Sequence, residues 1–261
     1  MKKILQIIAV FMMVFSFSSC KSQELSSTYI SSERIVDGYV NDWNDNEMTF
    51  LEKQDVMVGV VNDNENLYIS FYTTSPERAK QLMQAGFTVW LDANGKKKTF
   101  GIHYPIRNIE GMDMPKFPGK NKSQLPQEKG GQDFMEKVDK NLVIIDGKEE
   151  KEYKKEYLDD VQVAYSFDRE MFMYELRIPL KAQNHKYYVE PTKKNVIYAC
   201  IETDEMQKPQ RPSGPGGFHE GMGERPEGEQ RKGNPGGMMK GNMPNMPSKI
   251  ELWMKIQLAN Q

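Results

Sequence analysis

Four methionines near the end of the chain form its densest set of soft metal ligands. Met238, Met239, Met243 and Met246 lie in a stretch rich in glycine and proline. Thioether sulfur is a soft ligand that selects Cu(I). Low-complexity segments also collect methionine without forming a site. The cluster therefore gives only a hypothesis of Cu(I) binding, which titrating Cu(I) into a peptide of residues 233–248 would test.

The other reactive side chains form no recognisable catalytic or metal-binding set. His103, His185 and His219 are far apart, and none makes a ligand-spaced pair with Cys, Asp or Glu. The run Asp92–Gly95 is similar to the start of a calcium loop, but no closing glutamate follows and a hairpin turn explains it. The sequence contains no nucleophile-elbow or nucleotide-binding motif, and no acidic pair stands out. We predict neither an enzyme nor a bound cofactor.

Cys20 follows a pattern typical of an export signal. Lys2 and Lys3 give a positive start, residues 4–17 are almost entirely apolar, and two serines precede the cysteine. The apolar run is shorter than the ~20 residues of a spanning helix. It resembles a bacterial lipoprotein signal, with Phe17 where leucine is usual. The resemblance implies that residues 1–19 are removed and that the Cys20 thiol is acylated. A plain secretory peptide is the alternative.

The residues after the cysteine bear on the location of the protein. Lys21 stands where many lipoproteins retained at an inner membrane have aspartate, so the resemblance favours the outer membrane. Residues 20–33 are polar and rich in serine and are predicted to be a tether. The chain has a second cysteine, Cys200, in an apolar run. It has no partner for a disulfide, and we expect a buried, unreactive thiol.

Hairpin signals dominate the rest of the chain, residues 34–261. Predicted strands pair around an Asn/Asp cluster at 62–66, around Asn94–Gly95 and around Asp168–Glu170. Further strands are predicted at 196–201 and 250–258, and a short helix at 76–84 with Ser75 as its cap. Short strands at hairpin spacing predict an all-β fold, an antiparallel β-sandwich of the immunoglobulin-like or jelly-roll-like type.

Two irregular insertions interrupt this pattern. Residues 109–138 are rich in Lys, Gly, Pro and Gln and are predicted to form a long insertion. Residues 207–248 are dominated by Gly, Pro, Met and charge, and such a composition predicts a disordered loop. Both lie between predicted strands, so we predict one domain with two insertions.

Four short motifs carry a family resemblance. They are Ile35–Trp43, with Asp-Gly and Asp-Trp; Asn66–Phe71; Thr88–Asp92; and Tyr174–Pro179, with Glu-x-x-Ile-Pro. In this order they resemble the family 9 carbohydrate-binding modules and the related DOMON-like sandwich domains, over roughly residues 34–258. The resemblance implies a β-sandwich that binds a sugar or, as in some relatives, haem.

The motif residues themselves have structural explanations. Asp37–Gly38 suits a turn, Asp42 suits the cap of the turn that places Trp43, and Pro179 suits a strand end. We expect Glu175 to face outward from its strand and to pair with a basic neighbour. These roles make the fold and do not require a ligand.

Period-two alternation identifies the candidate binding residues. In the predicted strands, the apolar neighbours of Trp90, His103 and Trp253 share the opposite face, so these three side chains point away from the core. Aromatic rings stack on sugar rings, and polar groups hydrogen-bond their hydroxyls. The alternative is that the insertion covers this face and buries both indoles.

Charge narrows the choice of partners. The formal charge of −2 becomes −4 when Lys2 and Lys3 are removed, which argues against nucleic acid. The expected partners are a lipid bilayer, reached through the acylated Cys20, and a glycan bound without catalysis at the cell envelope. The alternatives are a structural lipoprotein that binds an envelope protein, and binding of haem or Cu(I).

Overall fold

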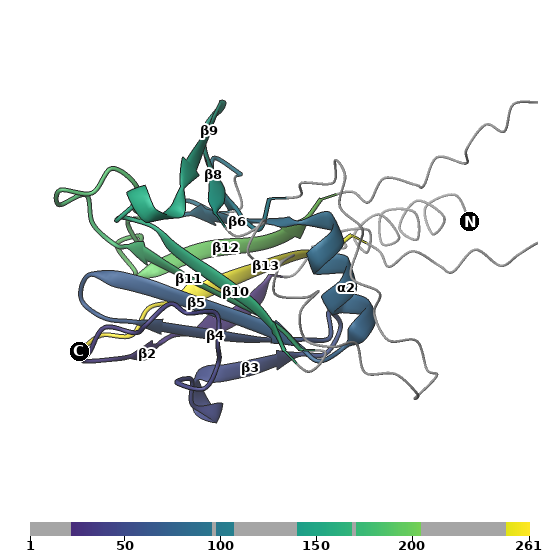
Figure 1. The fold of residues 1–261 in the computed structure, drawn as a ribbon. Helices are drawn as coiled ribbons and strands as arrows, with labels where there is room; N and C mark the ends of the chain where they lie inside the picture. The colour runs from purple at the N-terminus through teal and green to yellow at the C-terminus, as the bar shows by residue number, and fades with distance from the viewer. Residues whose placement is uncertain (1–21, 96–97, 107–139, 169–170, 205–248) are drawn as a thin grey trace, which may run out of the picture.

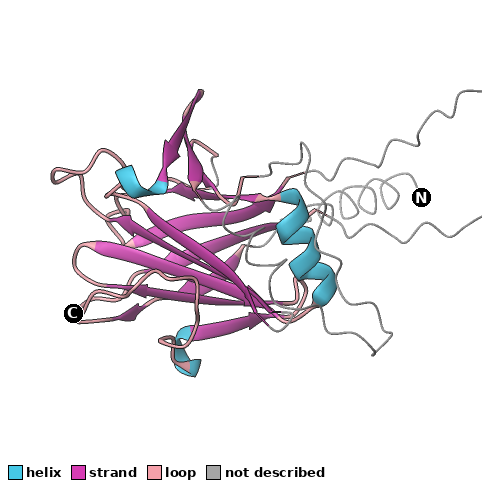
Figure 2. Ribbon diagram, viewed as in Figure 1, coloured by secondary structure: helices cyan, strands magenta, loops and turns pink. Residues whose placement is uncertain are grey.

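The computed structural model describes residues 22–95, 98–106, 140–168, 171–204 and 249–261. These residues form two facing β-sheets, with the helix α2 (Pro76–Ala85) across one end (Figures 1 and 2). The predicted all-β sandwich is confirmed. The expected helix is also present, and Ser75 Oγ caps it by accepting a hydrogen bond from Arg78 N.

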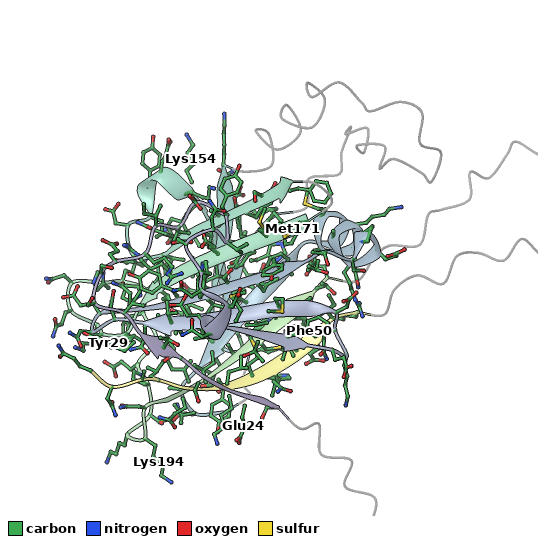
Figure 3. The ribbon with its side chains drawn as sticks, turned by 90° about the horizontal axis from the view of Figure 1, so that it is seen from below. Glu24, Tyr29, Phe50, Lys154, Met171 and Lys194 are labelled. Atoms are coloured by element: carbon green, nitrogen blue, oxygen red, sulfur yellow. The ribbon has the colours of Figure 1, made fainter. Side chains whose placement is uncertain are left out.

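One sheet has seven strands in the order β1-β13-β12-β6-β7-β8-β9. Their bounds are β1 Gln23–Ser26, β6 Phe87–Asp92, β7 Phe100–His103, β8 Asn141–Asp146, β9 Glu149–Lys154, β12 Val196–Thr203 and β13 Glu251–Gln257. Figure 3 shows Glu24 of β1 and Lys154 of β9 on opposite sides of the molecule, as expected for the two edge strands of this sheet.

The other sheet has six strands, in the order β10-β11-β5-β4-β2 with β3 also paired to β4. Their bounds are β2 Thr28–Tyr29, β3 Met48–Leu51, β4 Val56–Asn62, β5 Asn66–Thr73, β10 Gln162–Asp168 and β11 Met171–Pro179. The predicted hairpins β4–β5, β6–β7 and β10–β11 are antiparallel pairs, as is β12–β13. The three hairpins follow from turn residues and apolar alternation on adjacent segments, whereas 47 residues separate β12 from β13.

Two expectations need correction. Residues 20–33 are not simply a tether, because Gln23–Ser26 pairs with β13 and Thr28–Tyr29 pairs with β4. Both of these pairings are parallel, so the sheets are mixed and not purely antiparallel. The polar sequence hid these strands because they lie at sheet edges, where one side of the strand meets solvent.

The core lies between the two sheets and is rich in aromatic rings. The Phe71 ring lies 5.0 Å from those of Phe87 and Tyr174, centroid to centroid, and Phe172 joins the group. All four residues are at most 1% exposed. A second, small core lies on the outer face of the six-stranded sheet, where the segment before β3 places Trp43 against Val61 and Tyr68. This segment covers that face, whereas the seven-stranded sheet presents a pocket on its own outer face.

Candidate functional site

A pocket of about 560 Å³ opens on the outer face of the seven-stranded sheet, and we call it the outer-face pocket. Two of the three predicted site residues, Trp90 and His103, line it. The full lining is Thr88, Trp90, His103, Ile106, Val143, Ile145, Glu150, Glu202, Asp204 and Lys249. It therefore combines an aromatic and aliphatic floor with charged side chains, a composition suited to a polar ligand that has an apolar face.

Strand register explains why these residues meet. Trp90 of β6 pairs with Gly101 of β7, Gly101 pairs with Ile145 of β8, and Ile145 pairs with Glu150 of β9. Paired residues in adjacent strands present their side chains on the same face. This row runs across four strands, and its continuation beyond Trp90 reaches Cys200 and then Trp253.

A second row lies two residues away along the strands. Thr88 of β6 pairs with His103 of β7, which in turn pairs with Val143 of β8. On the other side Thr88 pairs with Glu202 of β12. The two rows together form most of the pocket, so its chemistry is set by alternate residues of five adjacent strands.

Gly101 creates the seat of the Trp90 indole. A Cβ added at Gly101 would lie 2.7 Å from Trp90 Cε3, 2.8 Å from Trp90 Cζ3 and 2.9 Å from Thr88 Cγ2. Carbon atoms pack at about 3.5–4.0 Å, so only a glycine leaves room for the ring at this place. The indole is half-buried and lies against the sheet backbone at Gly101. Glycine in a strand interior often marks such a close approach.

Glu202 fixes the edge of the same indole. Trp90 Nε1 donates a 2.7 Å hydrogen bond to Glu202 Oε2, while Lys98 Nζ and Lys249 Nζ lie 2.9 Å and 2.6 Å from Glu202 Oε1. Burial raises the pKa of Glu202, but the hydrogen bonds from Lys249, Lys98 and Trp90 outweigh it, so the pKa lies below its usual range. Glu202 is therefore an ionised, fully engaged carboxylate that orients the ring.

His103 is held by its neighbours on the floor of the pocket. Its Nδ1 lies 3.0 Å from Thr88 Oγ1, and its Nε2 lies 3.8 Å from Asp204 Oδ2. Burial lowers the pKa of His103, and the negative charges of Asp204 and Glu150 oppose that effect only in part. A histidine with a lowered pKa is neutral at pH 7 and can both donate and accept a hydrogen bond.

Trp253, the third predicted residue, does not line the pocket. It lies on β13, on the same cross-strand row as Trp90 but with Cys200 of β12 between them. Its Nε1 donates to Glu251 Oε1 at 3.2 Å, and Lys98 Nζ bridges Glu251 and Glu202 at 2.9 Å each. Two strand spacings separate Trp90 from Trp253, about 10 Å. Trp253 is half-buried, so it extends the aromatic surface beyond the pocket.

Cys200 lies on this row and is fully buried, as predicted. Burial raises the pKa of the Cys200 thiol to about 12. Such a thiol carries almost no thiolate at neutral pH and is unreactive.

Of the four family motifs, Thr88–Asp92 is part of β6 in the seven-stranded sheet, and the other three lie in or against the six-stranded sheet. Glu175 does not pair with a basic residue as expected. It is 2% exposed, and its carboxylate accepts hydrogen bonds from Asp37 N, Gly38 N and Trp43 Nε1 at 2.9, 2.8 and 2.7 Å. Glu175 does point away from the main core, but the segment that carries Trp43 folds over it and supplies neutral donors. These contacts confirm that the motif makes the fold.

Several predicted positions lie outside the described residues, namely Cys20, Met238, Met239, Met243 and Met246. Insertions 109–138 and 207–248 also lie outside the described residues, whereas the strands on either side of each insertion are described. Within the described part of the chain, no group of three His, Cys, Asp or Glu side chains is placed to hold a metal ion. In that same part no helix is both long and apolar enough to cross a membrane.

Comparison with solved structures finds matches of low similarity, and three of them are described below. No family model and no curated protein matches the chain. A family 9 carbohydrate-binding module from Caldicellulosiruptor kristjanssonii, in complex with glucose, is 12% identical with a TM-score of 0.34, covering 70% of this chain and 78% of that one. The same module in complex with cellotriose is also 12% identical, with a TM-score of 0.32, and the match covers 71% of this chain and 77% of that one.

The third structure is a protein from Bacteroides uniformis described as a candidate carbohydrate-binding protein. It is 9% identical with a TM-score of 0.36, and the match covers 70% of this chain and 84% of that one. At such identities and TM-scores these structures assign no ligand to this chain. The fold class rests on the two sheets themselves, and the function has to be argued from the pocket.

Sequence reasoning missed the charged rim of the pocket. Glu150, Glu202, Asp204 and Lys249 come from segments far apart in the chain. Alternation does place Glu202 on the same face as Cys200, but only the register of β12 on β6 brings it to Trp90. The one local signal that was available is Gly101, a glycine in the middle of a predicted strand.

Proposed function

We propose that this chain binds a carbohydrate without catalysis, in the outer-face pocket, while held at the cell envelope by lipid on Cys20. The observation that carries the proposal is the Trp90 indole, which is laid on Gly101 and fixed at its edge by Glu202. A ring held in this way is a preorganised platform for the apolar face of a sugar.

The rim of the pocket supplies the polar half of such a site. Glu150, Asp204 and His103 offer acceptors and donors within one pocket, and Thr88 orients the histidine. Sugar hydroxyls are both donors and acceptors, so they suit a rim of mixed groups. Trp253 offers a second aromatic ring on the same face for a longer glycan.

A glycan array tests the proposal directly. We expect full-length wild-type protein to bind at least one glycan, and Trp90→Ala to weaken that binding about tenfold or more, because a stacked aromatic ring contributes about 1–3 kcal/mol. Tyr157→Ala is the control, since Tyr157 is 72% exposed and lies outside the pocket. If Trp90→Ala binds glycan as tightly as the wild type, the binding site is not the outer-face pocket. If the wild type binds no glycan on the array, the proposed function is wrong.

Haem is the alternative ligand that the family resemblance raises. The pocket lining contains one histidine, His103, and no methionine among the described residues. The imidazole is also engaged by Thr88 and faces Asp204. These contacts favour the sugar over haem, and a Soret band after reconstitution with haem would reverse that preference.

The anchor proposal has a geometric consequence. β1 begins at Gln23, so only Lys21 and Ser22 separate it from Cys20, and three extended residue steps reach about 10 Å. Gln23 pairs with Met254, next to Trp253, and β6 lies three strands from β1. Acylation of Cys20 would therefore hold the aromatic face close to the bilayer surface.

Metabolic labelling with an alkyne fatty acid tests the anchor. We expect labelling of the wild type and of Cys200→Ala, and none of Cys20→Ala, because only Cys20 follows the export signal. Labelling that persists in Cys20→Ala would contradict the anchor. Membrane fractionation of the same variants would test the outer-membrane location, and a pull-down with and without residues 207–248 would test the envelope-protein alternative.

A further inference from the structure

The protein contains two tryptophans that are seated on glycines, one on each sheet. Trp43 lies on Gly59, where an added Cβ would be 2.6 Å from Trp43 Cε3, and Trp90 lies in the same way on Gly101. Each indole also donates a 2.7 Å hydrogen bond to a glutamate, Trp43 to Glu175 and Trp90 to Glu202. The two tryptophan sites are built alike, so the further contacts of Trp43 indicate which contact a ligand could make with Trp90.

In the first seat a cation covers the aromatic face. The Arg34 guanidinium carbon lies 4.3 Å from the centroid of a Trp43 ring. Its side chain is 8% exposed and pairs with Glu47 at 3.1 Å and with Asp42 at 3.9 Å. A cation between an aromatic face and carboxylates gains both cation–π and Coulomb energy.

In the second seat the described residues supply the carboxylates, but none of their cation–π contacts is made with the indole. The cation–π contacts of the described residues lie on Trp43, Tyr104, Tyr153, Tyr157 and Tyr187, and Lys249, the lysine that lines the pocket, is held by Glu202. Glu150 and Asp204 line the same pocket, and neither is paired with a Lys or Arg of the described chain. Lys98 and Lys249 are directed at Glu202, and Lys98 also pairs with Glu251, so the charges of these two lysines are balanced by those two carboxylates. The acidic charge of Glu150 and Asp204 is thus left for a ligand.

We infer that the glycan bound by the outer-face pocket carries a free, protonated amino group, which lies over Trp90 as Arg34 lies over Trp43. The ligand class is an amino sugar that is not N-acetylated. This inference rests on the proposed function and narrows it. Acetylation removes the positive charge, and an acidic sugar would be repelled by Glu150 and Asp204.

Calorimetry with three matched trimers tests the inference on the full-length protein in detergent. The trimers are β-1,4-linked glucosamine, N-acetylglucosamine and glucose. A cation–π contact with nearby carboxylates contributes about 1–2 kcal/mol, so we expect the glucosamine trimer to bind about tenfold more tightly than the other two. The preference should fall as salt is raised, because charge carries it.

Two double variants distinguish an effect of the pocket carboxylates from an effect of the protein's overall negative charge. Glu150→Gln with Asp204→Asn should abolish the preference for the glucosamine trimer. Glu149→Gln with Glu52→Gln removes the same charge from exposed positions outside the pocket and should keep it. A preference that survives the first double variant would overturn the inference.

The remaining outcomes separate the inference from the proposed function. Equal binding of the three trimers, or a glycan array in which only sugars without a free amine bind, overturns the inference and leaves the function standing. An array on which no glycan binds, with no heat from any trimer, overturns both.

Discussion

Replacing Gly101 by alanine is the sharpest test of the Trp90 platform. The new Cβ would lie 2.7 and 2.8 Å from two carbons of the indole, about 1 Å closer than carbon atoms pack. The backbone at Gly101 is not left-handed, so alanine itself causes no strain there. The indole therefore has to tilt away from the sheet by about 1 Å.

The expected energies follow from where the ring lies. Overpacking usually costs about 1–3 kcal/mol, and a half-buried ring that can tilt into the pocket belongs at the low end. Alanine also regains about 0.5–1 kcal/mol because glycine is unfavourable inside a strand. The free energy of unfolding should therefore change by less than about 1 kcal/mol. Glycan affinity should fall about tenfold, since the stacking geometry and the bond to Glu202 are both disturbed.

Gly59→Ala provides the matched control. Its Cβ would meet Met48 Sδ and approach Trp43 Cε3 to 2.6 Å, in a seat that Arg34 covers. Trp43 is 8% exposed and cannot tilt outward, so we expect a loss of about 1–3 kcal/mol in the free energy of unfolding. The folded fraction of this variant should bind glycan with unchanged affinity. Urea unfolding and calorimetry on both variants measure the two effects separately.

The reasoning would be refuted by one combination of results. If Gly101→Ala binds as tightly as the wild type while Trp90→Ala does not bind, the tilt of the indole is unimportant. The seat would then be a packing feature, and the platform would owe its orientation to Glu202 alone.

Three further predictions concern buried groups. Burial raises the pKa of Cys200 to about 12, so iodoacetamide at pH 8 should alkylate it only after unfolding, and rapid labelling of the folded protein would be inconsistent with this. Glu175→Gln should lower the free energy of unfolding by about 1–3 kcal/mol, because an amide cannot accept all three hydrogen bonds of the carboxylate; a stability equal to the wild type in urea unfolding would disprove that role. Burial lowers the pKa of His103 below the ordinary 6.5, so as the pH falls the unfolded chain takes up the proton first and this residue reduces stability; an NMR titration midpoint above 6.5 would contradict the assignment.

Much of the fold could be predicted because its signals are local. Asn94–Gly95, the Asn/Asp cluster at 62–66 and the cap Ser75 each act on neighbouring residues and were correctly interpreted. β8 was missed although Asp146–Gly147 after its apolar run is a local hairpin signal, but three other missed strands have no such signal. β9 reads EEKEYK without apolar alternation, and β1 and β2 pair in parallel with residues more than thirty positions away.

The site was predictable only in part, for the same reason. Alternation correctly placed Trp90 and His103 on one face, because side-chain direction is a property of a single strand. It could not separate Trp253 from the pocket, nor bring Glu150 and Asp204 to it, since those relations depend on strand order. Glu175 shows the same limit: its direction follows from the strand, but its partners come from a segment over 130 residues away.

NMR of the indole N–H groups tests the central claim most directly. The chain has three tryptophans, so its spectrum contains three indole signals, which Trp90→Phe, Trp253→Phe and Trp43→Phe would assign. On titration with a bound glycan we predict a large shift of the Trp90 signal and none of the Trp43 signal, which Glu175 and Arg34 enclose. A glycan that binds while the Trp90 signal stays in place would contradict the account.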